Sequence, residues 1–168
     1  MLTKSKYYVY YAIIIVLVML SIFLYYQNYY LSNLYSFHKT DLNMSGLCSP
    51  KMPSFVIYYA DNCRTCASAV NSFQNVTSLF GLWSNNTFYS GYFCAWKFNI
   101  SAYNNNLTNN IPDSAISLFN QIGINRVPLI VFNGEYYKVG GFTNNETAYN
   151  QILNYICLSV NESLPQCS

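Results

Sequence analysis

The stretch that decides the fold is residues 55–66, which read FVIYYADNCRTC. Its first part, residues 55–60, is an unbroken run of β-branched and aromatic residues, and such a run is typical of a central strand covered on both faces. The chain then turns through Asp61 and Asn62 into a Cys-x-x-C motif made by Cys63 and Cys66. The motif therefore stands directly after the predicted strand.

The residues after the motif predict a helix. Apolar side chains recur at steps of three or four residues from Cys66 to Phe80, so we expect an amphipathic helix that faces the sheet and ends at Gly81. The motif would thus lie at the junction of a strand and a helix.

The rest of the chain completes an α/β pattern. We predict a strand over 92–98, an exposed Asn-rich loop over 101–110, and a short helix that starts at Pro112 and stops at Gly123. A hairpin follows over 129–139 around Asn133-Gly134, and Gly140-Gly141 ends it. Thr143 and Glu146 form a capping box for a last helix, whose buried stripe is Ala148, Tyr149, Ile152, Leu153 and Ile156.

The Cys-x-x-C spacing suits several chemistries, among them half of a zinc site and a fixed local disulfide. Zinc needs about four ligands, and the chain offers one histidine, His38, and no second Cys-x-x-C. At a helix start the N–H groups and the helix dipole stabilise a thiolate, which is the attacking species, and Arg64 adds positive charge. We therefore expect Cys63 to attack and Cys66, one turn further on, to resolve.

Val127-Pro128 lies immediately before a predicted strand, a position where proline often marks a special turn. At this point the chain resembles the thioredoxin family over residues 55–157. The resemblance rests on the strand and Cys-x-x-C stretch 55–80, residues 97–100, residues 122–134 and Val139-Gly140-Gly141.

The resemblance implies a thioredoxin-like fold, with a central mixed sheet flanked by helices. It assigns Cys63 as nucleophile and Cys66 as resolving thiol. It also implies that Pro128 is cis, and that Val127 and Pro128, with Arg64 and Thr65 nearby, bind an extended substrate segment.

The chain departs from the family pattern around the motif. The family usually places Trp before the first cysteine and Gly-Pro between the two, where this chain has Asn62 and Arg64-Thr65. The family's buried acid aligns with Ile57, and Lys97 matches the lysine near that acid. Without the acid, proton removal from Cys66 would fall to water, Lys97 or substrate.

The N-terminus predicts a membrane anchor. Lys4 and Lys6 precede residues 7–26, which hold no charge, no Pro and no Gly and have tyrosines at both ends. About 20 residues span a bilayer core of about 30 Å, and Lys before the span favours a cytoplasmic N-terminus. The competing interpretation is a cleaved signal peptide, although the bulky residues 25–30 do not suit a peptidase. We expect residues 1–6 inside, 7–26 in the membrane, 27–54 as stalk and start of the domain, and 55–168 as the domain outside.

Two features agree with an oxidising compartment outside the cytoplasm. All six cysteines follow the span. Seven glycosylation sequons also follow it, at Asn43, Asn75, Asn85, Asn99, Asn106, Asn145 and Asn161. Cys48, Cys94, Cys157 and Cys167 are expected to form structural disulfides; Cys157 with Cys167 would close the chain's end, but three pairings stay open.

The composition narrows the function. Eight basic and six acidic residues give a net charge of +2, which predicts no nucleic-acid partner. No motif predicts a nicotinamide, flavin or metal cofactor, so electrons would pass between protein thiols or disulfides and a membrane redox partner. Three alternatives stay open: a tethered reductase, a redox-inert interaction protein with a fixed Cys63–Cys66 disulfide, and copper delivery, for which His and Met ligands are missing near the motif.

Overall fold

The computed structural model describes residues 3–49, 51–101, 111–124, 126–160 and 164–167. The sequons at Asn106 and Asn161, Asn125 of the Val127-Pro128 segment, and residues 102–110 of the expected loop lie outside that part. The chain forms two compact units, Met1–Ser36 and Phe37–Ser168.

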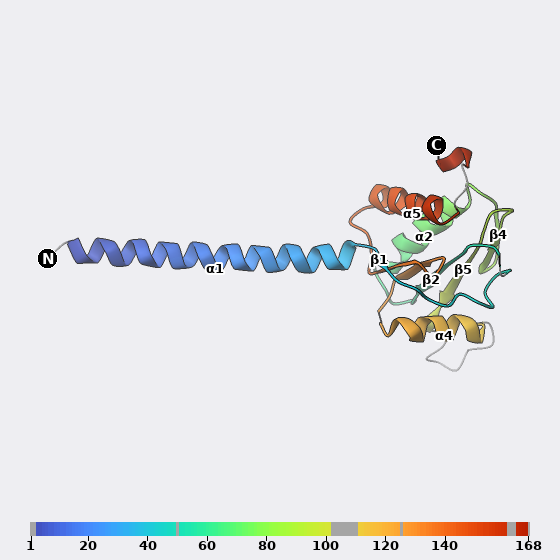
Figure 1. Ribbon diagram of the computed structural model, residues 1–168, viewed down its shortest axis with the longest axis horizontal. Helices are drawn as coiled ribbons and strands as arrows, with labels where there is room; N and C mark the ends of the chain where they lie inside the picture. Colours follow the sequence, from blue (N-terminus) through green and yellow to red (C-terminus); the bar gives the residue numbers. More distant parts are fainter. Residues whose placement is uncertain (1–2, 50, 102–110, 125, 161–163, 168) are drawn as a thin grey trace. The chain divides into compact units, whose positions relative to one another are not determined.

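The first unit is one helix, α1 (Thr3–Tyr35) (Figure 1). Its window Tyr10–Gln27 has a mean hydropathy of 1.9, and none of these residues is buried. The predicted apolar helix is confirmed, and it extends beyond both ends of residues 7–26. At about 1.5 Å per residue the window is about 27 Å long, close to the thickness of a bilayer core. An exposed apolar helix of this length indicates a membrane anchor or a signal sequence.

The second unit is built on a seven-stranded mixed sheet in the order β1-β7-β6-β2-β5-β4-β3. Strands β2 and β5 are parallel, and every other neighbouring pair is antiparallel. The strands are β1 (His38–Lys39), β2 (Ser54–Tyr59), β3 (Leu82–Ser84), β4 (Thr87–Tyr89), β5 (Cys94–Asn99), β6 (Leu129–Phe132) and β7 (Tyr136–Val139). The predicted α/β class is confirmed.

Strand β2 lies at the centre of the sheet and supplies both layers of the core. Phe55 and Ile57 pack on one face, and Val56 and Tyr58 pack on the other, all at most 1% exposed. The buried Tyr58 hydroxyl donates a hydrogen bond to the Ala115 carbonyl at 2.7 Å. The continuous apolar run thus reflects burial on both sides, as predicted.

Helices cover both faces of the sheet (Figure 1). The face of Phe55 and Ile57 is covered by α2 (Cys66–Thr77) and α5 (Asn145–Val160). The opposite face is covered by α4 (Asp113–Ile122). All three helices were predicted.

Two helix ends differ from the sequence-based expectation. Helix α2 stops at Thr77 instead of running to Gly81, because Leu79 and Phe80 donate to carbonyls three residues back and tighten the last turn. Helix α5 is capped by Asn144, whose side-chain oxygen accepts from the Thr147 N–H at 2.7 Å. The predicted Thr143 cap is therefore wrong by one residue; Asn caps a helix at least as well as Thr.

Strands β3 and β4 form a hairpin that the sequence pattern did not reveal. Asn85, in its two-residue turn, has a φ of 55°, a conformation that Asn tolerates better than most residues. The adjacent β5 begins at Cys94 instead of Tyr92. The predicted hairpin of β6 and β7 is confirmed, with Asn133 and Gly134 at φ 49° and 73°.

Residues 37–49 belong to the second unit. His38 and Lys39 of β1 pair with β7, and the Leu42 N–H donates to the Gly134 carbonyl at 2.9 Å. Leu47 is 5% exposed in the core. Of the expected stalk 27–54, residues 27–36 therefore lie in the first unit and the described residues from Phe37 lie in the second.

All six cysteines lie among the described residues and are disulfide-bonded. Cys48 pairs with Cys94 and Cys157 pairs with Cys167, so the structure selects one of the three open pairings. The first bridge ties the segment before β2 to β5, and the second ties α5 to the 3-10 turn at Pro165–Cys167.

Candidate functional site

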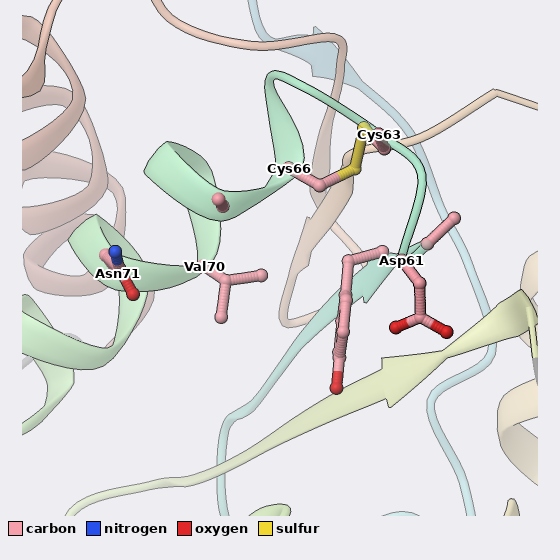
Figure 2. Close-up of a pocket in the computed structure, with 8 residues that line it drawn as sticks. Asp61, Cys63, Cys66, Val70 and Asn71 are labelled. Carbon is pink, nitrogen blue, oxygen red and sulfur yellow. A yellow bond between two sulfur atoms is a disulfide. The ribbon is translucent and has the colours of Figure 1, made fainter.

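The third disulfide, Cys63–Cys66, lies where β2 ends and α2 begins (Figure 2). Two consecutive turns make the connection. The Cys63 N–H donates to the Ala60 carbonyl at 3.3 Å, and the Cys66 N–H donates to the Cys63 carbonyl at 3.1 Å. The Cα atoms of the two cysteines are 5.2 Å apart. Cys66 is the first residue of α2, so both sulfurs lie near the helix N-terminus, where a thiolate is stabilised.

The two cysteines differ in exposure. Cys66 is 1% exposed, whereas Cys63 is half-buried. A bulky disulfide or thiol from another molecule can therefore approach Cys63 more readily than Cys66. This difference separates an attacking position from a resolving position.

The Cys63 sulfur has two polar neighbours. It lies 3.6 Å from the hydroxyl oxygen of Thr65 and 3.7 Å from the carbonyl oxygen of Val127. In the reduced protein the Thr65 hydroxyl can donate to a Cys63 thiolate, while a Cys63 thiol can donate to the Val127 carbonyl. The site thus offers a partner for each protonation state of Cys63.

The Val127–Pro128 peptide bond is cis, as the resemblance implies. Val127 is half-buried and Pro128 is buried, directly before β6. The fold therefore brings a segment more than 60 residues away in the chain against Cys63.

The two residues between the cysteines have different surroundings. Both are exposed. A Cβ atom built on Gly141 would lie 2.8 Å from the Cβ of Thr65, so the backbone after β7 passes close to the motif at that side chain. Of the two intervening residues, Thr65 has a fixed neighbour in the loop after β7.

A pocket of about 210 Å³ opens beside the disulfide. Its lining includes Tyr59, Asp61, Cys63, Cys66, Val70 and Asn71. In Figure 2, Val70 and Asp61 lie on opposite sides beneath the disulfide. Because both cysteines line the pocket, a molecule seated there would lie close to the disulfide.

Asp61 is held in place by a closed set of hydrogen bonds. Its Oδ1 accepts from the Asn99 side-chain nitrogen at 2.6 Å, and its backbone N–H donates to the Ser101 hydroxyl at 3.0 Å. The Ser101 N–H in turn donates to the Asn99 side-chain oxygen at 3.0 Å. The network joins the loop after β2 to the end of β5, which is its parallel neighbour.

Ile57, at the position where the resemblance aligns a buried acid, is fully buried. Lys97 is its direct partner on β5, and the Lys97 ammonium lies 5.4 Å from the centre of the Trp83 ring.

A second lysine, Lys138, lies on the same face of the sheet as Ile57 and is 0% exposed. Burial lowers the pKa of Lys138 to about 8.

The structure therefore brings together Cys63, Cys66, Thr65, Val127 and Pro128. The other four cysteines are bonded elsewhere in the domain. Sequence reasoning missed the pocket residues Tyr59, Val70 and Asn71 and the Asp61 network. One signal was available: Asn99 ends β5 and Asp61 follows β2, and the carboxyl ends of parallel strands meet at the same sheet edge.

Searches against protein-family models and against curated proteins find no match to this chain. The fold and the site define an α/β domain with a Cys-x-x-C disulfide at the carboxyl end of its central strand, and an exposed apolar helix precedes this domain in the chain. Its function has to be argued from that geometry.

Proposed function

We propose that this chain is a membrane-tethered thiol:disulfide oxidoreductase, whose thioredoxin-like domain acts on protein thiols or disulfides outside the cytoplasm. The observation that carries the proposal is the position of Cys63. Cys63 is the more exposed cysteine of a disulfide at a helix N-terminus, and its sulfur lies 3.7 Å from the carbonyl oxygen of Val127, beside Pro128.

The topology supports a thioredoxin-like fold. The four strands β5, β2, β6 and β7 are adjacent in that order, with β5 parallel and β6 antiparallel to the central β2. In the chain, the elements β2, α2, β5, α4, β6, β7 and α5 follow the order strand, helix, strand, helix, strand, strand, helix that the sequence pattern predicts, with the β3–β4 hairpin inserted before β5. Strands β1, β3 and β4 then extend the two edges of this core.

In the oxidising direction, a substrate thiolate attacks the Cys63 sulfur, the Cys63–Cys66 bond breaks, and Cys66 leaves as a thiolate. A second substrate thiolate then attacks the substrate sulfur of the mixed disulfide, and Cys63 leaves as a thiolate. The substrate loses two electrons and two protons, and the cysteine pair gains them. Reduction of a substrate disulfide runs through the same steps in reverse.

The surrounding residues have defined roles in this cycle. Thr65 donates to the Cys63 thiolate, and Arg64 adds positive charge beside it. The Val127 and Pro128 segment provides a backbone edge against which an extended substrate lies. A membrane redox partner accepts or supplies the two electrons at the end of each cycle.

The apolar helix α1 and the three disulfides support the location that we propose for the domain. The helix anchors the chain, Lys4 and Lys6 hold the N-terminus in the cytoplasm, and the domain lies outside, where three disulfides are stable.

The test measures reduction of insulin and oxidation of a dithiol peptide by the full chain in detergent, comparing wild type with Cys63→Ser. The matched control is the double variant Cys157→Ser, Cys167→Ser, which removes a disulfide away from the site. We expect Cys63→Ser to abolish both reactions and the control to retain them. Equal rates for wild type and Cys63→Ser would instead favour the redox-inert alternative.

A further inference from the structure

The lining of the pocket beside the disulfide carries a negative charge. Among the residues that the structure describes as its lining, Asp61 is the charged one. Asp61 is exposed, and Asn99 and Ser101 fix its side chain and backbone. Because the carboxylate is already held in place, binding a cation costs less side-chain entropy than it would at a mobile carboxylate.

The remaining lining suits a long apolar stem. Tyr59 presents an aromatic ring, and burial, with the nearby Asp61 carboxylate, raises the pKa of its hydroxyl, so the ring stays neutral. Ala67 and Val70 supply aliphatic lining, and Val70 lies on the side opposite Asp61 in Figure 2. Lysine and arginine place an aliphatic stem on apolar surface and a charged head on a carboxylate or an aromatic ring.

We propose that this pocket receives the side chain of a lysine or arginine that flanks the reacting cysteine of the substrate. The inference rests on the proposed function, because Cys63 and Cys66 line the same pocket. It defines the substrate class as proteins whose exchangeable cysteine has a basic neighbour. Asp61 binds the cation, and Asn99 is a positioning residue that holds Asp61.

The test uses cyclic disulfide peptides of identical sequence, apart from one residue next to a cysteine, placed before it in one series and after it in another. That residue is lysine, arginine, norleucine or glutamate. The second-order rate constant for reduction of each peptide is measured with the reduced full chain in detergent. Norleucine keeps the stem of lysine and removes its charge, so the ratio of the lysine rate to the norleucine rate isolates the cation.

For the wild type, in one of the two series, we expect lysine and arginine peptides to react roughly fivefold faster than the norleucine peptide, and the glutamate peptide to react more slowly. The preference should shrink at high salt, because an exposed ion pair is screened. Asp61→Asn should bring the ratio to about one. Asp41→Asn removes the same charge from an exposed residue outside the pocket lining and should leave the ratio unchanged.

Two further variants separate specificity from a general effect on the thiols. Asn99→Ala should lower the ratio by releasing Asp61, and Tyr59→Leu should lower it by removing the aromatic ring. A variant that slows the lysine and norleucine peptides equally acts on the cysteines and not on the cation. If Asp61→Asn behaves in that way, the inference is overturned.

The failure of this inference differs from the failure of the proposed function. If the wild type neither reduces any of the disulfide peptides nor oxidises their dithiol forms, the oxidoreductase proposal fails. If it reduces the lysine and norleucine peptides at equal rates in both series, the oxidoreductase proposal stands and the basic-neighbour preference is wrong.

Discussion

Lys138 and Ile57 lie in one row across the sheet, with Ile130 between them. Ile57 pairs with Ile130 of β6, and Ile130 pairs with Lys138 of β7. The row faces α2 and α5, and the Lys138 ammonium lies 5.0 Å from the centre of the Phe142 ring. The resemblance aligns a buried acid with Ile57. In this chain the buried ionisable residue of the row is a base, Lys138, which lies two strands from Ile57.

This burial predicts how stability depends on pH. Since burial lowers the pKa of Lys138 from 10.5 to about 8, only the unfolded chain holds this proton between those values, and the free energy of unfolding should rise with pH there. The slope from this one group is at most about 1.4 kcal/mol per pH unit. Denaturant unfolding of wild type and Lys138→Met from pH 7.5 to 9.5 measures the difference. Parallel curves for the two proteins would contradict the lowered pKa.

Thr65 should tune the reactivity of Cys63. Its hydroxyl lies 3.6 Å from the Cys63 sulfur, and loss of a hydrogen bond to a thiolate raises the pKa of that thiol. We expect Thr65→Val to slow alkylation of reduced Cys63 by iodoacetamide at pH 7 by roughly three- to tenfold. Thr65→Ser restores the hydroxyl and should restore the rate. A pH profile that is identical for all three proteins would exclude this role.

The two structural disulfides should differ in their contribution to stability. Cys48–Cys94 joins residues 46 positions apart, and Cys157–Cys167 joins residues 10 positions apart. The longer loop loses more entropy in the unfolded chain, so its bridge contributes about 4 kcal/mol and the shorter about 2.7 kcal/mol. Unfolding of the two double Cys→Ala variants tests the order. A larger loss for the Cys157–Cys167 variant would show that the loop-entropy account does not hold here.

The anchor and the signal-sequence interpretations of α1 predict different products. With an N-terminal tag, an anchored chain keeps the tag and stays in the membrane fraction after alkaline carbonate. A chain that starts at Phe37, the first residue of the second unit, should be soluble and folded. Loss of the tag together with release of the domain would identify α1 as a cleaved signal.

The sequence predicts the centre of the fold better than its edges. Residues 55–60 and 129–132 are continuous apolar runs because both faces of their strands are buried, so their pattern is unambiguous. Strands β3 and β4 escaped prediction because they are only three residues each, and Leu82 and Tyr89 are 84% and 59% exposed. Their turn lies in a polar stretch that resembles a loop.

The parts of the site that depend on short sequence motifs were predictable, and the parts that depend on how β2 and β5 pair were not. Cys63, Cys66 and Pro128 follow from motifs in the chain. The contact between Asn99 and Asp61 requires that β2 and β5 be neighbours in register, which no local pattern states. Lys138 is fully buried in β7, and nothing in the sequence of that strand, Tyr-Tyr-Lys-Val, indicates that its lysine is buried.

The close approach of Gly141 to Thr65 has a consequence for how such a site evolves. The space beside residue 65 is filled by backbone, so a side chain at 141 and a Cβ at 65 exclude one another. Among descendants of a common ancestor, position 141 should therefore stay glycine wherever residue 65 has a Cβ atom. Residue 65 is thus inherited together with a glycine 76 positions later, although both residues between the cysteines are exposed.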